Sequence, residues 1–171
     1  GLNTLILRVS NGYNTIVPMP ERSKFSQNPV FNGLDVIETY QKACDQEGIN
    51  LSLCFDVYYN ENAQTAERNW ITEPNGNVAG ISNKYFSPGS VDFKAYYLEY
   101  IEYVIGRYDG ITNIMFDYLR YPKFHEDCDI GYDYHTMQSF SEQEEVSLHD
   151  VQAIKAELFQ SPLWSKWNKY R

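Results

Sequence analysis

Three charged side chains stand at the ends of short apolar segments of the sequence: Arg8, Asp56 and Asp117. Burying a charge without a partner is costly, so each of them is expected to be paired or placed for a function. Carboxylates act as nucleophile, general acid or general base in enzymes, and a nearby arginine favours the ionised carboxylate. The three residues are therefore candidates for one site, although Arg8 and Asp56 could equally form a structural ion pair.

Asp117 is the strongest candidate because Tyr118, Arg120 and Tyr121 follow it at once, in "MFDYLRYP". Arg120 is placed to hold the Asp117 carboxylate ionised, and tyrosine rings can pack against a sugar while their hydroxyls hydrogen-bond it. Further candidates for substrate binding lie in the segments after the second and third apolar runs: Tyr58, Asn60 and His125. Tyr58 and Asn60 could equally be packing residues at the rim, and an exposed loop histidine is the favoured alternative for His125.

The apolar segments that carry these residues are typical of buried β-strands separated by helices. Strands are predicted over 3–9, 49–59 and 110–118, and helices over 33–47 and 87–108. This order predicts an α/β fold of consecutive βαβ units with adjacent parallel strands. The carboxyl ends of such strands meet at one edge of the sheet, where ligands bind.

Alternation of side chains along a strand decides which residues share a face of the sheet. Arg8 shares a face with Ile6, Asp56 with Cys54, and Asp117 with Met115, so the more polar face of each strand ends in a charge. Cys44 and Cys54 are expected to be small core residues. The cysteines show neither CxxC nor Cys/His zinc spacing, so we expect no metal site of that type and no cofactor.

Local signals predict where the helices begin and end. Asn32 is the expected N-cap of the first helix and Gly48 its C-terminal stop, while Ser87-Pro88 should begin the second. A third helix is predicted over 141–159, with a first turn of solvated glutamates at Glu142, Glu144 and Glu145. The segment "SPLWSKWNKYR" should begin a fourth, with Trp164 and Trp167 facing a core.

Composition limits the classes of partner. The chain has 171 residues, of which 43% are hydrophobic, and a net charge of −9. That size suits one domain with a substantial core. The negative charge argues against nucleic acid and against an anionic membrane surface as partners, and no segment approaches the roughly 20 apolar residues of a membrane span.

Several of these segments together resemble a known family. "FDYLRYP" resembles the strand-four motif of the bacterial glycosyl-hydrolase-like family ten, whose TIM barrel is distantly similar to that of the alpha-amylase clan. "GLNTLILRV" resembles its second strand, and "FSPGSVDFKAYYLEYIEYVIGRYDGITNIMFDYLRYP" its Asn/Ser-Pro-Gly segment, long helix and following strand. "GYD" and "PLWSKW" resemble the segment entering the next helix, whereas "CFDVYYN" departs from the Asn-containing third-strand end of that family.

The resemblance implies a single partial (β/α)8 TIM-barrel domain over residues 1–171, truncated at both ends and holding about strands two to four. The remainder of the barrel would come from the parent chain, and secretion or attachment to the cell envelope is implied as well. In the alpha-amylase clan the residue that ends strand four is the nucleophile, and Asp117 occupies the matching position. The general acid would lie on a later strand, with Asp56 as a weaker alternative, so this chain alone is expected to be inactive.

The expected function is that of a glycoside hydrolase domain acting on a polysaccharide, for example one of the bacterial cell envelope. One alternative is a non-catalytic barrel that binds glycans. Another is a barrel enzyme for a different substrate, since fold does not fix function. The sugar, the linkage and the stereochemical course stay open. Because an open parallel sheet has exposed edges, we also expect the isolated chain to associate or to be poorly soluble.

Overall fold

A computed structural model describes residues 1–11, 14–60, 70–73, 77, 84–120, 130–150 and 162–170. The chain divides into two compact units, one comprising residues 1–63 and 94–120 and the other residues 64–93 and 121–171. The expectation of a single barrel domain stays a prediction. None of the described helices is both long and apolar enough to cross a bilayer.

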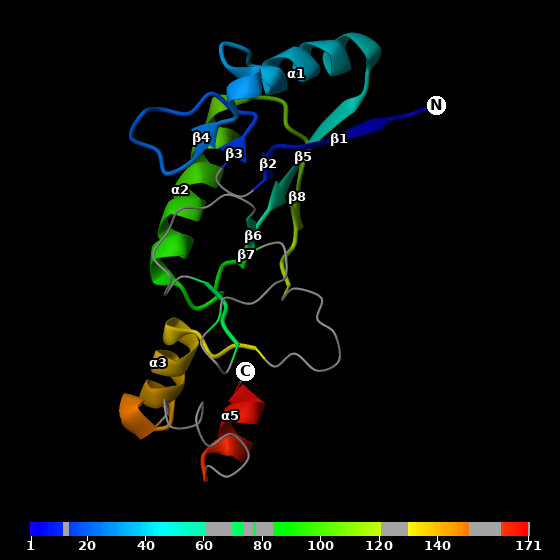
Figure 1. The fold of residues 1–171 in the computed structure, drawn as a ribbon. Coiled ribbons are helices and arrows are strands. Elements are labelled where there is room, and N and C mark those ends of the chain that lie inside the picture. Colours follow the sequence, from blue (N-terminus) through cyan, green and yellow to red (C-terminus); the bar gives the residue numbers. More distant parts are fainter. Residues whose placement is uncertain are drawn as a thin grey trace. The chain divides into compact units, whose positions relative to one another are not determined.

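The first unit is organised around a parallel three-stranded sheet of β1 (Thr4–Arg8), β5 (Asn50–Asp56) and β8 (Asn113–Asp117). The strands lie side by side in the order β1-β5-β8 (Figure 1). This is the order in which the three predicted strands follow one another in the sequence. The predicted α/β class with adjacent parallel strands is confirmed. The described residues form no closed barrel, and a partial barrel stays a prediction.

The register of the sheet supports the predicted division of its faces. Arg8 pairs with Cys54, which pairs with Met115, and Asp56 pairs with Asp117. Residues paired across parallel strands point to the same side of the sheet, so the three charged residues lie on one face. The opposite face carries the apolar rows, for example Leu7 beside Leu53.

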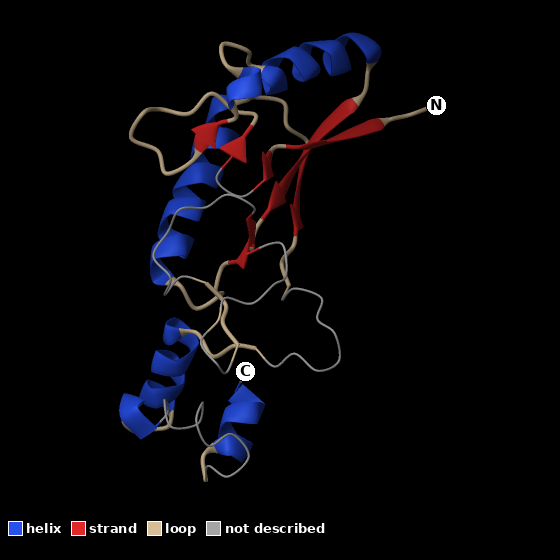
Figure 2. Ribbon diagram, in the orientation of Figure 1, coloured by secondary structure: helices blue, strands red, loops and turns tan. Residues whose placement is uncertain are grey.

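Helix α2 (Val91–Arg107) runs beside the sheet (Figure 2), and its tyrosines contact residues of β5. The Tyr100 ring lies edge-on to Phe55, with centroids 5.7 Å apart, and stacks on Phe25 at 4.2 Å. The hydroxyl of Tyr97 donates to the backbone oxygen of Asp56 at 2.8 Å. Burial raises the pKa of both Tyr97 and Tyr100 above the ordinary range, so both hydroxyls stay neutral donors. These contacts fix the carboxyl end of β5, where Asp56 lies.

Helix α1 (Val36–Glu47) begins three residues later than the sequence predicted. Asp35 is its N-cap and accepts a hydrogen bond from the Glu38 backbone at 3.1 Å. Asn32, the predicted cap, instead closes the 3-10 turn η1 (Pro29–Phe31). Gly48 ends the helix with a φ of 65°, as predicted, because this left-handed conformation carries little penalty for glycine.

The start of α2 also differs from the prediction. Ser87 caps only a local turn by accepting from the Gly89 backbone, while Ser90 accepts from the Phe93 backbone at 3.1 Å in the first turn of α2. The remaining strands are short: β2 (Ser10–Asn11), β3 (Asn14–Thr15), β4 (Ser26–Gln27), β6 (Tyr59–Asn60) and β7 (Lys84–Tyr85).

The second unit contains α3 (Tyr134–Gln143) and α5 (Trp164–Tyr170). Its core is an aromatic cluster in which Trp167 is fully buried, as predicted, together with Tyr132, Met137 and Phe140. The predicted helix over 141–159 is wrong at its start, because Asp133 caps α3 and Glu145, with a φ of 54°, lies beyond its end. The glutamates Glu142, Glu144 and Glu145 therefore lie at the C-terminal end of a helix, and residues 151–159 lie outside the described part of the chain.

Candidate functional site

The carboxyl ends of the three parallel strands bring Arg8, Asp56 and Asp117 together. The Arg8 Nε lies 3.4 Å from Oδ1 of Asp56, and its Nη2 lies 3.1 Å from Oδ2 of Asp117. Arg8 can reach both carboxylates because it lies on the same face of the sheet two pairing rows before them, level with Cys54. One guanidinium therefore bridges carboxylates from two other strands, at the edge of the sheet where the sequence placed them.

The two carboxylates differ in their access to solvent. The Asp56 side chain is completely buried, whereas the side chains of Asp117 and Arg8 are 45% and 54% exposed. Asp56 ends the central strand, between β1 and β8, while Asp117 ends a strand with one neighbour among the described residues. A ligand from solution can therefore reach Asp117 and Arg8, but Asp56 offers it no surface in this conformation.

The electrostatics of the site centre on Arg8. Burial disfavours its charged form, but the nearby charge of Asp56 and smaller contributions that include Asp117 raise the pKa of Arg8 above its ordinary value. Burial, followed by the charge of Asp56, raises the pKa of the Cys54 thiol. The site thus combines a permanent cation, two carboxylates and a neutral thiol.

Cys54 is the site residue that the sequence assigned only to the core. It is buried, as predicted, but its sulfur and one oxygen each of Asp56 and Asp117 all lie within 4.8 Å of one another. Strand alternation could have identified it, because Cys54 is two residues before Asp56. Thiolate and carboxylate ligands can hold a divalent cation. Here, however, Arg8 already supplies positive charge to both carboxylates and the thiol has a raised pKa, so we assign no metal to these three residues.

Tyr118 holds an uncommon backbone conformation directly after Asp117. Its φ is 53°, which is costly for a residue with a Cβ atom, and its backbone N–H donates to Oδ1 of Asp117 at 2.7 Å. The ring stacks on Tyr59 with centroids 4.7 Å apart, and the guanidinium carbons of Arg120 and Arg8 lie 5.0 and 5.8 Å from its centroid. Tyr118 therefore helps to fix Asp117, and the guanidinium groups of both arginines lie over the Tyr118 ring.

The other predicted substrate-binding residues are placed less fully. Tyr58 is half-buried next to the site. Its backbone N–H donates to the backbone oxygen of Tyr118 at 3.4 Å, and burial raises the pKa of its phenol. Tyr121, His125 and the side chain of Asn60 lie outside the described part of the chain.

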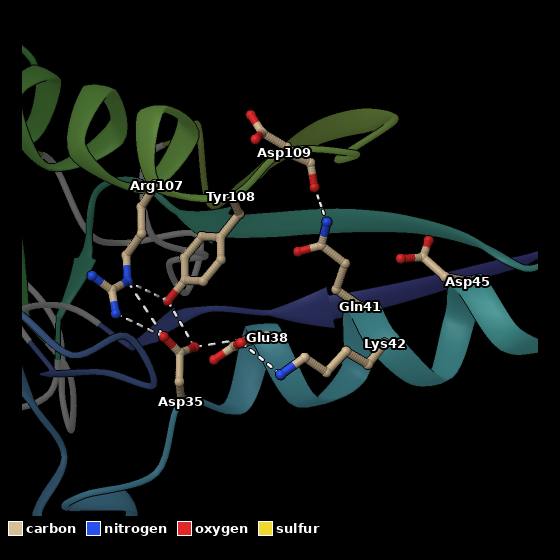
Figure 3. Close-up of a pocket in the computed structure, with 8 residues that line it drawn as sticks. All are labelled: Asp35, Glu38, Gln41, Lys42, Asp45, Arg107, Tyr108 and Asp109. Carbon is tan, nitrogen blue, oxygen red and sulfur yellow. Dashed lines mark hydrogen bonds and ion pairs between the residues drawn. The ribbon is translucent and has the colours of Figure 1, made fainter.

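A separate cavity of about 530 Å³ lies at the opposite side of the same unit, between α1 and the end of α2 (Figure 3). The side chain of Asp35 accepts from Nη2 of Arg107 at 2.9 Å and from the Tyr108 hydroxyl at 2.8 Å. Burial would raise the pKa of Asp35, but the hydrogen bonds, led by that from Arg107, outweigh it and the pKa is lowered. The side-chain amide of Gln41 donates to the backbone oxygen of Asp109. These contacts join α1 to the end of α2, which is a structural role.

Comparison with known proteins finds no match to this chain. No protein-family model matches the chain, and neither a curated protein nor a solved structure matches it.

Proposed function

We propose that this chain contributes strands and an active-site carboxylate to a glycoside hydrolase that acts on a polysaccharide, with Asp117 as the nucleophile. Further strands would complete a barrel around the polar face of the sheet and supply the general acid. The sequence resemblance to a glycosyl-hydrolase-like family motivates the proposal, and the geometry of the site supports it independently.

The observation that carries the proposal is the contrast between the two carboxylates beside Arg8. Asp117 is half-exposed, lies at the carboxyl end of a parallel strand and is held 3.1 Å from a guanidinium. A nucleophilic carboxylate must be ionised and must reach the anomeric carbon, and a neighbouring cation favours the ionised form. Asp56 shares the cation but is completely buried, so it is poorly placed to protonate a leaving group.

The test uses the longest natural protein in which this sequence occurs. Reducing-sugar release from a panel of bacterial and plant polysaccharides is measured for the wild type and for Asp117→Asn, which keeps the size of the side chain but removes its charge. We expect release to fall about a thousandfold, equivalent to about 4 kcal/mol of transition-state stabilisation. The matched control is Asp109→Asn, an exposed aspartate that precedes β8, which should leave release unchanged.

Release that survives Asp117→Asn would show that Asp117 is not the nucleophile. A non-catalytic glycan-binding barrel is the second candidate, and the cluster of Tyr59, Tyr118 and Arg120 at the rim favours it. Measurable binding of a polysaccharide without any release, by wild type and variant alike, would select that function instead.

A further inference from the structure

We propose that Asp56 is a positioning residue, which fixes the guanidinium of Arg8 so that Arg8 in turn orients the carboxylate of Asp117. This inference rests on the proposed function, because it concerns how the same site is organised. It replaces direct substrate binding, the role that the sequence suggested for Asp56, by an action through Arg8.

The first step of the argument is that Asp56 is itself fixed. It is completely buried at the end of the central strand, and its backbone oxygen accepts the hydrogen bond from the buried Tyr97 hydroxyl at 2.8 Å. Buried side chains have few rotamers open to them. The Asp56 carboxylate is therefore a stationary negative charge below the rim of the site.

The second step is that Arg8 needs such an anchor. Its side chain is 54% exposed, and a long exposed side chain loses considerable rotamer entropy when it is held in one geometry. The two contacts use different nitrogens: Nε lies at ion-pair distance from Asp56, 3.4 Å, and Nη2 donates a hydrogen bond to Asp117 at 3.1 Å. The planar guanidinium makes these directions interdependent, so holding Nε sets the position of Nη2.

The third step separates this role from that of a structural ion pair, in which Asp56 and Arg8 would only stabilise the sheet. A structural pair predicts that loss of Asp56 changes stability and leaves Asp117 in the same environment. A positioning pair predicts that loss of Asp56 releases Arg8 from its place beside Asp117. Cationic reagents from solution should then react faster with the Asp117 carboxylate.

The test measures that environment without any sugar substrate. A water-soluble carbodiimide carries a positive charge and adds to a carboxylate oxygen, and an added amine then displaces the urea to leave an amide on the side chain. Labelling of Asp117 is quantified by peptide mass spectrometry in the full-length natural protein. A unit charge held 3.1 Å away should slow the cationic reagent by roughly tenfold even at the dielectric constant of water.

We expect Arg8→Met to label Asp117 roughly tenfold faster than the wild type does, and Asp56→Asn to give most of that increase. The double variant should label no faster than Arg8→Met alone, because Asp56 acts through Arg8. Labelling of Asp117 in Asp56→Asn at the wild-type rate, or additive effects in the double variant, would overturn the proposal.

A second variant, Arg8→Lys, tests the proposal if Asp56→Asn fails to fold. It changes a half-exposed side chain and not a buried one. Lysine retains the charge but has a single ammonium in place of the two-pronged guanidinium, so labelling should rise towards the rate of Arg8→Met. Labelling of Arg8→Lys at the wild-type rate would show that charge alone suffices and would overturn the positioning role.

Kinetics with whichever polysaccharide of the panel the wild type cleaves provide the second readout. Asp56→Asn should lower kcat severalfold while KM changes little, because the buried side chain contacts no substrate. A rise in KM with an unchanged kcat would return Asp56 to substrate binding. If no polysaccharide is cleaved but the labelling pattern is as expected, the proposed function fails while the positioning of Asp117 stands.

Discussion

Replacing Arg8 with methionine should destabilise β5 far more than the loss of an ordinary surface ion pair. An exposed pair contributes about 0–1 kcal/mol, and breaking a fully buried pair costs about 3–5 kcal/mol. Here Asp56 is 0% exposed and Arg8 is 54% exposed, with 3.4 Å between Nε and Oδ1. Solvent screens the arginine but not the aspartate, so we expect a loss of about 2–3 kcal/mol for Arg8→Met.

The double variant tests the origin of that loss. Methionine removes the counter-charge of a buried carboxylate, and Asp56→Asn then removes the carboxylate itself. We expect the double variant to lie within about 1 kcal/mol of the wild type, because neither charge remains to be compensated. The matched control is Lys42→Met, which breaks a 2.6 Å pair with Glu38 between side chains that are 68% and 54% exposed. It should cost no more than about 0.5 kcal/mol.

Hydrogen exchange of the β5 amides, followed by mass spectrometry, is the suitable assay. The chain divides into two compact units, so a global unfolding curve need not measure the stability of the sheet. The exchange rate of the β5 amides instead measures how often that one strand opens. A loss of about 2–3 kcal/mol corresponds to exchange about 30- to 160-fold faster. If the double variant exchanges as fast as the two single losses added together, the reasoning is refuted, because the residues would then act independently.

Two further predictions concern other parts of the first unit. The pKa of Asp35 is lowered in the folded chain, so its stabilisation is fully present above the ordinary aspartate pKa of about 3.9 and is lost as the pH falls through the folded value. Exchange of the α1 amides should accelerate over that acidic range in the wild type, and an Asp35→Ala variant showing the same acceleration would contradict this. The isolated chain should self-associate through β8, because Phe116 is 50% exposed there. Phe116→Lys should lower the associated fraction in analytical ultracentrifugation, whereas Leu34→Lys, at a side chain 49% exposed, should not, and a wild type that sediments as a single monomer species would end this expectation.

The strands and their polar face could be predicted from the sequence because both depend on local patterns. Apolar runs of strand length gave β1, β5 and β8, and alternation assigned Arg8, Asp56 and Asp117 to one face, in agreement with the pairing Asp56 to Asp117. Parallel pairing then needed only the intervening helices. Each of these steps uses residues that are close together in the chain.

The helix boundaries were wrong where distant contacts decide them. Asn32 and Asp35 are both good N-caps, and the local sequence does not choose between them. The structure chooses Asp35 through Arg107 and Tyr108, which are 72 and 73 residues away. In the second unit Asp133 caps α3 by accepting from both the backbone N–H and the hydroxyl of Thr136, and the predicted glutamate turn consequently falls at the C-terminal end of that helix, with Glu142 inside it.

The different exposure of the two carboxylates could not be predicted, because their local sequences are nearly the same. "CFDV" and "MFDY" both present an aspartate directly after a phenylalanine, yet Asp56 is 0% exposed and Asp117 is 45% exposed. The difference comes from sheet order, since β5 lies between two strands and β8 has a neighbour on one side among the described residues. The predicted series of adjacent strands already placed β5 in the middle, but the alternation of side chains along a strand does not give the exposure of its last residue.

This sheet order explains why an apolar strand should end on a charge at all. A carboxylate on an outer strand, with only an exposed arginine beside it, would share the disorder of that long side chain. The central strand supplies a second, buried carboxylate that holds the same arginine by Nε. Burying Asp56 is unfavourable by itself, but it converts a mobile surface cation into a fixed one facing Asp117, and fixed charges at a reacting centre need little reorganisation during the reaction. If the proposed function holds, Asp117 is the reactive carboxylate because Asp56 is the buried one, and exchanging the exposure of the two residues should then disable the site even if every charge is kept.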